Sequence, residues 1–322
     1  MRSLLCSIAV TALLCAPAAH AQWKPEKNLE IVIGLAAGSF QDQTGRLIQK
    51  IAQERKLLPV STSLVNKVGA GGVVAWSYMN SRAGDPYHLL IASSSVMTSH
   101  ITGVSPYAMS EFTPVASLST QYIALAVNAA SPIRTGRDLV ARLKQDPLSL
   151  AFANNGRGNN LHIMMAVVAK AAGVDVRKLK IAFFQGGGEL TTALMGGHVD
   201  VIATATSNIL PHFQAGRLRI IGIAAPRRLG GALAEVPTWK EEGVDSIVQN
   251  WSGVLGAKGI TPEQVAVWEN LIAQVAKTDD WKAALQRNQQ EPYYLGSRET
   301  AAFLREQYAQ LRGSLAELGF AK

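Results

Sequence analysis

The sequence predicts an α/β protein of two domains, each a mostly parallel sheet flanked by helices. Short apolar runs typical of buried strands alternate with amphipathic helical segments, and this alternation favours parallel strands joined by crossover helices. The first run is 29–33, and helical periodicity follows at 44–55, where Leu47, Ile48 and Ile51 share one face. A chain of 322 residues is long enough for two domains that each bury a core.

The remaining elements follow in the same alternation. In the first domain, strands at 60–65 and 88–92 flank a helix that ends at Met79. The second domain is expected to contain helices at 135–144, 161–172 and 189–195 and strands at 150–153, 181–184 and 199–203. Two apolar runs, Leu118–Asn128 and Arg219–Ala225, are expected to cross between the domains. This assigns residues 22–120 plus 222–322 to domain one and residues 121–221 to domain two.

The C-terminal part of the chain is expected to return to helices. Thr261-Pro262-Glu263-Gln264 combines an N-cap hydroxyl, proline at the first helical position and Gln at the third. The last helix carries an apolar stripe that includes Leu304 and Leu315, for which packing against its own domain is the expected role.

The first 21 residues have the pattern of an export signal. Arg2 precedes an apolar stretch at Ile8–Leu14, and Ala19-His20-Ala21 is a small-residue cleavage signature before Gln22. No other segment approaches the roughly 20 apolar residues of a membrane span, so we expect a soluble exported protein that begins at Gln22. A lipid anchor at Cys15 is the alternative, but Leu14 stands where such sites normally carry a small residue.

Composition narrows the possible functions. Both cysteines lie within residues 1–21, so we expect no disulfide and no thiolate in the exported chain. Without Arg2 the chain retains 30 basic and 23 acidic residues, a net charge of +7. These charges are scattered and accompany no nucleic-acid motif, which favours attraction of small anions over nucleic-acid binding.

Catalytic and cofactor motifs are weak in this sequence. It contains no Gly-x-Ser-x-Gly elbow, no phosphate-binding Gly-Lys-[Ser/Thr] loop and no closely spaced histidine pair, so we expect neither catalysis nor a metal. Gly156-Arg157-Gly158 begins a dinucleotide fingerprint, but Leu161 occupies the third glycine position, so no cofactor is expected. His162 is expected to be a hydrogen-bonded structural residue.

Four times, a short apolar run that predicts a buried strand ends in a Gly-, Ser- or Asn-rich loop and then becomes an amphipathic helix. Two of these loops are 34–42 and 154–160, and the serines 93–95 directly follow the expected strand at 88–92. In open α/β sheets, ligands bind at the carboxyl ends of the strands, where loop amides and helix N-termini offer free N–H donors. Such sites suit anions.

Several short motifs also occur in the order found in one family. They are Gly34–Asp42, Asn66–Gly72, Gly156–His162, Phe183–Gly186, Leu194–Asp200, Pro211–Arg219 and Val236–Thr238. With these motifs the chain resembles the Bug-type periplasmic receptors, the substrate-binding proteins of tripartite tricarboxylate transporters, over its whole exported length. The resemblance implies a type II-like binding protein in which two crossing strands join the domains and the cleft holds a carboxylate, largely through main-chain N–H groups and waters.

On this resemblance, the protein is expected to be a monomer that binds a small carboxylate and works with membrane transporter subunits. A sensor that signals to a membrane kinase and an exported α/β enzyme are the alternatives. The residues expected at the ligand are Leu35, Ser39, Phe40, Gln41, Asp42, Ser94, Ser95, Asn154, Gly156, Arg157, Gly158, Asn159, Asn160, Gln185, Gly186 and Thr204.

Some of these residues depart from the family pattern and predict an unusual ligand. The departures are Ser39, Phe40, Asn159, Gln185 and Thr204. Asp42 is expected either to contact the ligand or to orient its own loop. Arg157 either pairs with a second anionic group of the ligand or points into solvent.

Overall fold

The computed structural model describes residues 23–184 and 187–322. The predicted export signal with Cys15, and also Gln22, Gln185 and Gly186, lie outside the described residues. Within the described ranges, no helix is long and apolar enough to cross a membrane.

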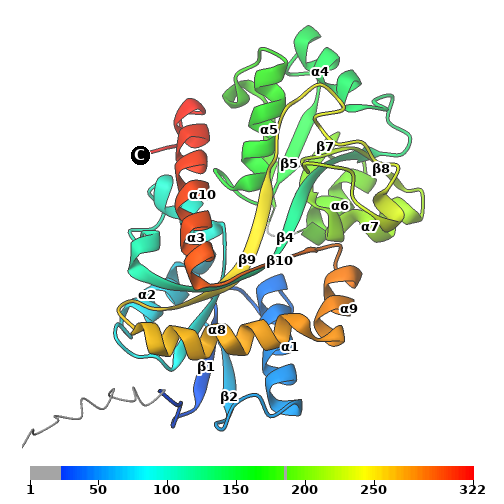
Figure 1. Cartoon of the computed structure of the whole chain (residues 1–322). Coiled ribbons are helices and arrows are strands. Elements are labelled where there is room, and N and C mark those ends of the chain that lie inside the picture. The colour runs from blue at the N-terminus through cyan, green and yellow to red at the C-terminus, as the bar shows by residue number, and fades with distance from the viewer. Residues whose placement is uncertain (1–22, 185–186) are drawn as a thin grey trace, which may run out of the picture.

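Strands and helices alternate through most of the chain (Figure 1). The strands are β1 (Leu29–Ile33), β2 (Thr62–Asn66), β3 (His88–Ser93), β4 (Phe112–Asn128), β5 (Ala151–Asn154), β6 (Lys180–Phe183), β7 (Val201–Ala205), β8 (Leu218–Ile223), β9 (Gln249–Ala257) and β10 (Glu291–Leu295). The α-helices are α1 (Phe40–Glu54), α2 (Val73–Asn80), α3 (Ser95–Ile101), α4 (Gly136–Gln145), α5 (Asn160–Ala171), α6 (Gly187–Met195), α7 (Thr206–Gln214), α8 (Pro262–Lys277), α9 (Asp279–Arg287) and α10 (Ser297–Glu317). Short 3₁₀ turns cover Ala70–Gly72, Met109–Glu111, Val176–Lys178 and Gly231–Leu233.

The strands pair in the order β2-β1-β3-β9-β4-β7-β5-β6, and β8 and β10 also pair with β4. We call the part of the molecule built on β1, β2, β3, β9, β10 and the first half of β4 lobe 1. The part built on the second half of β4 and on β5–β8 is lobe 2. Among the named strands that the structure describes, β1 pairs in parallel with β2 and β3, and β5 pairs in parallel with β6 and β7, whereas the central pairs are antiparallel. The predicted two-domain α/β fold is confirmed.

Two long strands connect the lobes (Figure 1). Residues 112–122 of β4 pair with β9, and residues 123–128 pair with β7 and β8. The other crossing strand is β9, which follows directly on Val248, whose N–H donates to the carbonyl of Ala224 over 3.1 Å. Both connections are therefore extended strands that run side by side.

The prediction that Arg219–Ala225 crosses between the domains is wrong. Most of this run is β8, which pairs with the lobe 2 half of β4 at Ala124–Asn128. The chain then stays on lobe 2, where Trp239 is fully buried against Gly136 and Gly222. An apolar run of strand length does not specify its pairing partner, so the sequence pattern alone could not distinguish β8 from a crossing strand. The division into residues 22–120 plus 222–322 and 121–221 stays a prediction.

The predicted start of α8 is confirmed. The Thr261 hydroxyl accepts from the Gln264 N–H, and the Gln264 side chain accepts from the Thr261 N–H over 2.8 Å, so each residue satisfies a free donor of the other. Along this helix, Trp268, Leu271 and Ile272 face the core of lobe 1. This face holds the helix against the sheet.

The C-terminal segment forms a third link between the lobes. Helix α10 packs on α3 in lobe 1, and its end reaches α5 in lobe 2 (Figure 1). There, Glu317 pairs with Lys170, and the Phe320 ring lies 4.7 Å from the His162 ring, centroid to centroid. The Lys322 N–H returns to the Ile101 carbonyl in lobe 1 over 2.9 Å. The lobes are thus connected on the α3–α5 side by packing as well as by strands.

Candidate ligand-binding site

A cavity of about 280 Å³ lies between the two lobes. The first turns of α1 and α3 from lobe 1 and of α5 and α7 from lobe 2 contribute to its walls. Each of these helices follows the carboxyl end of a strand: β1, β3, β5 and β7 precede α1, α3, α5 and α7. Strands β1 and β3 pair in parallel with each other, and so do β5 and β7. The site therefore lies where open α/β sheets bind ligands.

The cavity wall is polar and, within the described residues, uncharged. Hydroxyl groups come from Ser93, Ser94, Ser95, Thr98 and Ser207, and side-chain amides come from Gln41, Gln121, Asn155, Asn159, Asn160, Asn208 and Asn250. The other lining residues are Leu35, Phe40, Gly71, Ile123, Leu161 and Ala205. Such a wall recognises a ligand through hydrogen bonds rather than through ion pairs.

Asn160 connects the lobes across the floor of the cavity. Its side-chain amide, at the start of α5, donates to the Ser94 hydroxyl over 2.7 Å and to the Gln249 carbonyl over 2.8 Å. Ser94 in turn donates its single proton to Asn250 Oδ1 over 2.6 Å. The amide nitrogen of Asn250 thereby remains a donor on the cavity wall. Asn160 Oδ1 is buried and has no partner among the described residues.

A second set of bonds orients hydroxyl groups on each wall. In lobe 2, Gln121 donates to Ser207 Oγ over 2.6 Å, so the Ser207 proton remains available for another acceptor. In lobe 1, Gln41 donates to Ser93 Oγ over 3.2 Å, and Ser93 and Ser95 share a bond of 3.0 Å. In these bonds the serine oxygens accept from the glutamine side chains, and the hydroxyl proton of Ser207 remains free for a ligand.

Asp42 organises the first loop from within the protein. Its carboxylate accepts from the Gly38 N–H over 2.9 Å, from Arg46 Nε over 2.8 Å and from Asn66 Nδ2 over 2.9 Å. Burial opposes the ionised form of Asp42, but these three donors outweigh it and lower the pKa of the carboxyl below its usual value. Ser39 caps α1 by accepting from the Asp42 N–H.

The loop after β5 is held by an equally local network. Asn154 Oδ1 accepts from the Gly156 N–H over 2.8 Å, and Asn159 caps α5 by accepting from the His162 N–H over 3.0 Å. The Gly158 N–H donates to His162 Nδ1 over 3.0 Å, at a backbone φ of +72° that favours glycine. Burial, assisted by the charge of Arg157, lowers the pKa of His162 to about 4, so this structural ring is neutral and can accept that bond.

The predicted residues fall into two groups in the structure. Those that line the cavity are Leu35, Phe40, Gln41, Ser94, Ser95, Asn159 and Asn160. Those that lie behind or beside it are Ser39, Asp42, Asn154, Gly156, Arg157, Gly158 and Thr204. Their contact with a ligand stays a prediction.

Arg157 and Thr204 illustrate the second group. Arg157 is exposed, and its guanidinium carbon lies 5.4 Å from the centre of the Phe183 ring rather than on the cavity wall. Thr204 is fully buried, and its hydroxyl accepts from Asn208 Nδ2 over 3.0 Å.

Sequence reasoning missed several lining residues, among them polar ones on α7, β4 and β9. Ser207 and Asn208 begin α7, directly after β7, so the same strand–loop–helix pattern that marked the other loops could have found them. Gln121 and Asn250 lie in the crossing strands β4 and β9, where a large polar side chain within an apolar run was the available signal.

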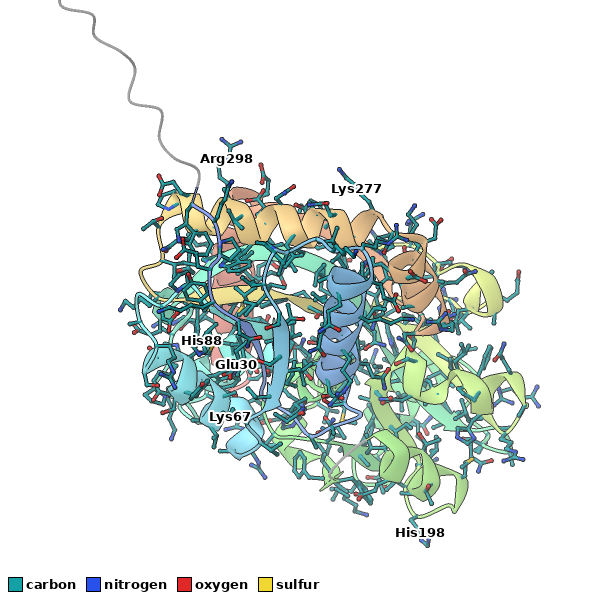
Figure 2. The ribbon with its side chains drawn as sticks, turned by 90° about the horizontal axis from the view of Figure 1, so that it is seen from below. Glu30, Lys67, His88, His198, Lys277 and Arg298 are labelled. Atoms are coloured by element: carbon teal, nitrogen blue, oxygen red, sulfur yellow. The ribbon has the colours of Figure 1, made fainter. Side chains whose placement is uncertain are left out.

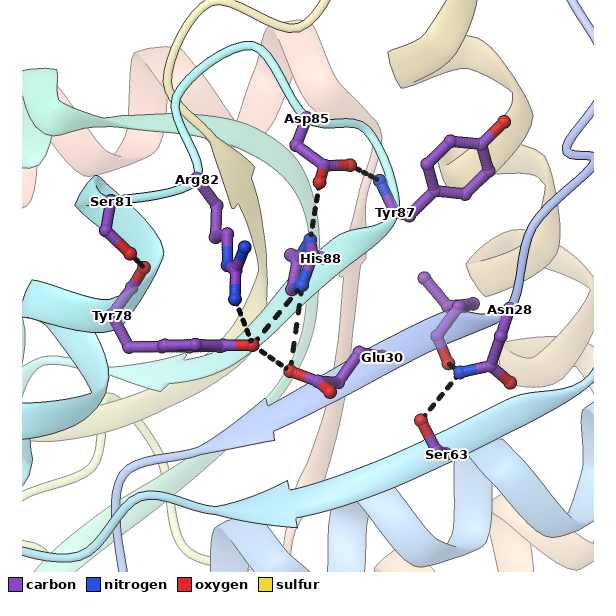
Figure 3. Close-up of polar contacts among 10 residues, drawn as sticks. Asn28, Glu30, Ser63, Tyr78, Ser81, Arg82, Asp85, Tyr87 and His88 are labelled. Carbon is purple, nitrogen blue, oxygen red and sulfur yellow. Dashed lines mark hydrogen bonds and ion pairs between the residues drawn. The ribbon is translucent and has the colours of Figure 1, made fainter.

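Another polar network lies at the opposite end of lobe 1 (Figures 2 and 3). There, the Tyr78 hydroxyl donates to Glu30 over 2.7 Å, and His88 lies between Glu30 and Asp85, at 3.7 and 3.3 Å. Glu30 and His88 belong to the first halves of β1 and β3, away from the carboxyl ends that face the cavity. No set of three or more His, Cys, Asp or Glu side chains in the described residues is arranged to hold a metal ion.

Residues 46–320 match the model of the tripartite tricarboxylate transporter family receptor. The chain belongs to this family. It is 28% identical over 316 residues to a UPF0065 protein of Cupriavidus necator. The alignment covers 98% of this chain and 94% of that protein. The family consists of solute-binding receptors, and the resemblance stated from the sequence motifs is confirmed.

Two solved structures share the fold. A TctC solute-binding protein from Polaromonas is 26% identical and superposes with a TM-score of 0.77, over 91% of this chain and 99% of that chain. R. palustris Rpa4515, solved with adipate, is 21% identical and superposes with a TM-score of 0.80, over 92% of this chain and 99% of that chain.

Proposed function

We propose that this protein is an exported periplasmic receptor that captures a small carboxylate in the cavity between its lobes and presents it to a tripartite tricarboxylate-type transporter. It performs no catalysis in this proposal. The observation that carries it is a cavity between two lobes whose wall is built from helix N-termini and uncharged donors.

An uncharged wall of this kind is chemically suited to a carboxylate. The first backbone N–H groups of a helix lack intrahelical partners, and the helix dipole favours a negative group at that end. Asn250 and Ser207 retain donors for the carboxylate oxygens, as derived above. Because no cation lies on the wall among the described residues, carboxylate recognition here rests on geometry and on the number of donors, which permits release to a partner.

The comparison with Rpa4515 supports the choice of ligand class, since adipate is a dicarboxylate and the two proteins share a fold. A receptor that reports ligand occupancy to a membrane kinase would use the same cavity between the lobes. It remains the second candidate, and the identity of the membrane partner distinguishes the two roles.

The test is a thermal-shift screen of mono-, di- and tricarboxylates against sugars. We expect carboxylates alone to raise the melting temperature, and at ~100 times the dissociation constant the stabilisation should be about 2.7 kcal/mol. Asn160→Ala removes the bonds that hold Ser94 and join the lobes beside the cavity and should abolish the shift, whereas Asn28→Ala, on the exposed start of lobe 1, should retain it. Stabilisation by sugars alone, or consumption of the added acid, would refute the proposal.

A further inference from the structure

A second cavity, of about 380 Å³, opens on lobe 1 outside the space between the lobes. Its walls are α1 and α9 together with the residues that follow α9 (Figure 1). Phe40 lines both this cavity and the central one.

Three cations line this cavity, and no carboxylate does among the described residues. They are Arg46, Lys50 and Arg287. Arg46 is paired with Asp42, but its side chain is still 54% exposed, and Lys50 is 3.9 Å from Glu54 in a solvent-exposed pair of little strength. Arg287 has no ion-pair partner among the described residues. The cavity therefore has a positive potential, unlike the uncharged space between the lobes.

A buried donor on the same wall lacks a partner. Gln290 is only 7% exposed, and its side-chain amide nitrogen has no hydrogen-bond acceptor among the described residues. Buried amide groups are nearly always hydrogen-bonded, because an unpaired one costs the free energy of its lost hydration. This unpaired donor is a second observation, separate from the three cations. It indicates that a bound ligand supplies the missing hydrogen-bond acceptor.

The rest of the wall is part polar and part apolar. Gln43, Thr44 and Asn288 are polar, whereas Phe40, Leu47, Trp281, Ala284 and Leu285 give the cavity an apolar part. Apolar side chains beside cations match an anion that also carries a compact apolar body. An inorganic anion would leave this part of the wall unused.

We propose that this cavity is a second ligand site, which binds a small organic anion with an apolar body such as an aromatic carboxylate. The anionic group lies toward Arg287 and Lys50 and accepts from Gln290, and the ring packs between Phe40, Leu47 and Trp281. This site is separate from the carboxylate site proposed between the lobes.

Benzoate is the probe, and the Trp281 indole N–H signal in the NMR spectrum of the full protein is the readout. We expect saturable benzoate shifts of this signal, with benzamide and inorganic phosphate each binding at least roughly tenfold more weakly, because each lacks one of the two recognised features. Arg287→Ala should weaken benzoate binding roughly tenfold or more, while Arg298→Ala, whose side chain is 94% exposed, should not change it.

Gln290→Met tests the buried donor with a side chain of similar size, and we expect a several-fold loss of benzoate affinity. Asn160→Ala separates this proposal from that for the central cavity, since it should leave the Trp281 response intact. Three results would overturn the second site: no Trp281 response in the wild type, equal binding of phosphate, or loss of the response in Asn160→Ala.

Discussion

At the scale of single residues, Asp42 is a charged group near the ligand site whose carboxylate is bonded entirely within its own lobe. Three donors converge on its two oxygens, and two of them, the Gly38 N–H and Arg46 Nε, share Oδ2. An amide has only one oxygen, so Asp42→Asn would place its NH₂ group against at least one of these donors.

We therefore expect Asp42→Asn to lower the free energy of unfolding by about 1–3 kcal/mol and to loosen the first loop. Denaturant unfolding measures the loss. Asp279→Asn is the matched control, because that side chain is 99% exposed and should cost little. Equal stability of the two variants would show that the Asp42 network contributes nothing.

His162 predicts a specific pH dependence of stability. Its pKa is about 4 in the folded protein, mainly through burial, and near 6.5 in the unfolded chain. Between these values the unfolded state binds the proton more tightly, so stability falls as the pH drops from about 6.5 to about 4. The total loss from this group is on the order of 3 kcal/mol.

Denaturant unfolding at a series of pH values measures this effect, with His162→Gln as the comparison because glutamine does not titrate. The difference in stability between wild type and variant should shrink as the pH falls through this window. A constant gap for His162→Gln would contradict the assignment.

Arg157 is a candidate ligand residue that the structure places off the cavity wall. Since its guanidinium lies over the Phe183 ring at 5.4 Å, we expect Arg157→Ala to change carboxylate affinity less than Asn160→Ala does. Titration calorimetry with a mono- and a dicarboxylate checks this. A loss of roughly 1.5–3 kcal/mol for the dicarboxylate alone would instead show direct pairing with a second acidic group.

At the scale of elements, the C-terminal helix is more than a cover for its own lobe. Its stripe residues Leu304 and Leu315 are buried in the core as the sequence predicts, but its last turn and the residues beyond it contact lobe 2. This contact lies on the α3–α5 side, beside Gly158 and His162. Because the C-terminal segment contacts both lobes, it links them on this side.

Deletion of residues 320–322 removes the Phe320 ring from His162 and the main-chain bond to Ile101. We expect a loss of about 1–2 kcal/mol in stability, together with a change in carboxylate affinity. Lys322→Ala keeps the main-chain bond and is the control. Unchanged stability and affinity in the deletion would show that the segment is not a link between the lobes.

At the scale of the whole molecule, β4 and β9 are the strands that join the lobes, and the cavity lies beside them. A ligand that contacts both lobes binds the closed arrangement preferentially and shifts the population toward it. We expect the radius of gyration from small-angle X-ray scattering to fall on addition of the carboxylate that gives the largest thermal shift.

Asn160→Ala provides the comparison for this scattering experiment, because it removes the bonds from lobe 2 to Ser94 and Gln249. Its radius without ligand should equal or exceed that of the wild type. A ligand-bound wild type with an unchanged radius would show that binding does not involve closure.

The sequence by itself determined the local features of this protein. The α/β alternation, the capping box at Thr261, and the polar loops at Gly34–Asp42 and Asn154–Asn160 all depend on neighbours within a few residues, so a local pattern predicts them. For the same reason, seven predicted residues, among them Gln41, Ser94 and Asn160, lie on the cavity wall.

Only the tertiary structure decided which strands pair and which distant side chains meet. β8 and β9 are similar apolar runs, and their partners depend on the packing of the whole chain rather than on their own residues. Ser94 meets Asn250 across 156 positions, and Gln121 meets Ser207 across 86. Asp42 and Arg157 are charged loop residues in the sequence, but the fold directs the first into its own loop and the second onto Phe183. Long-range contacts are selected by the total burial and hydrogen bonding of the folded state, which no short segment contains.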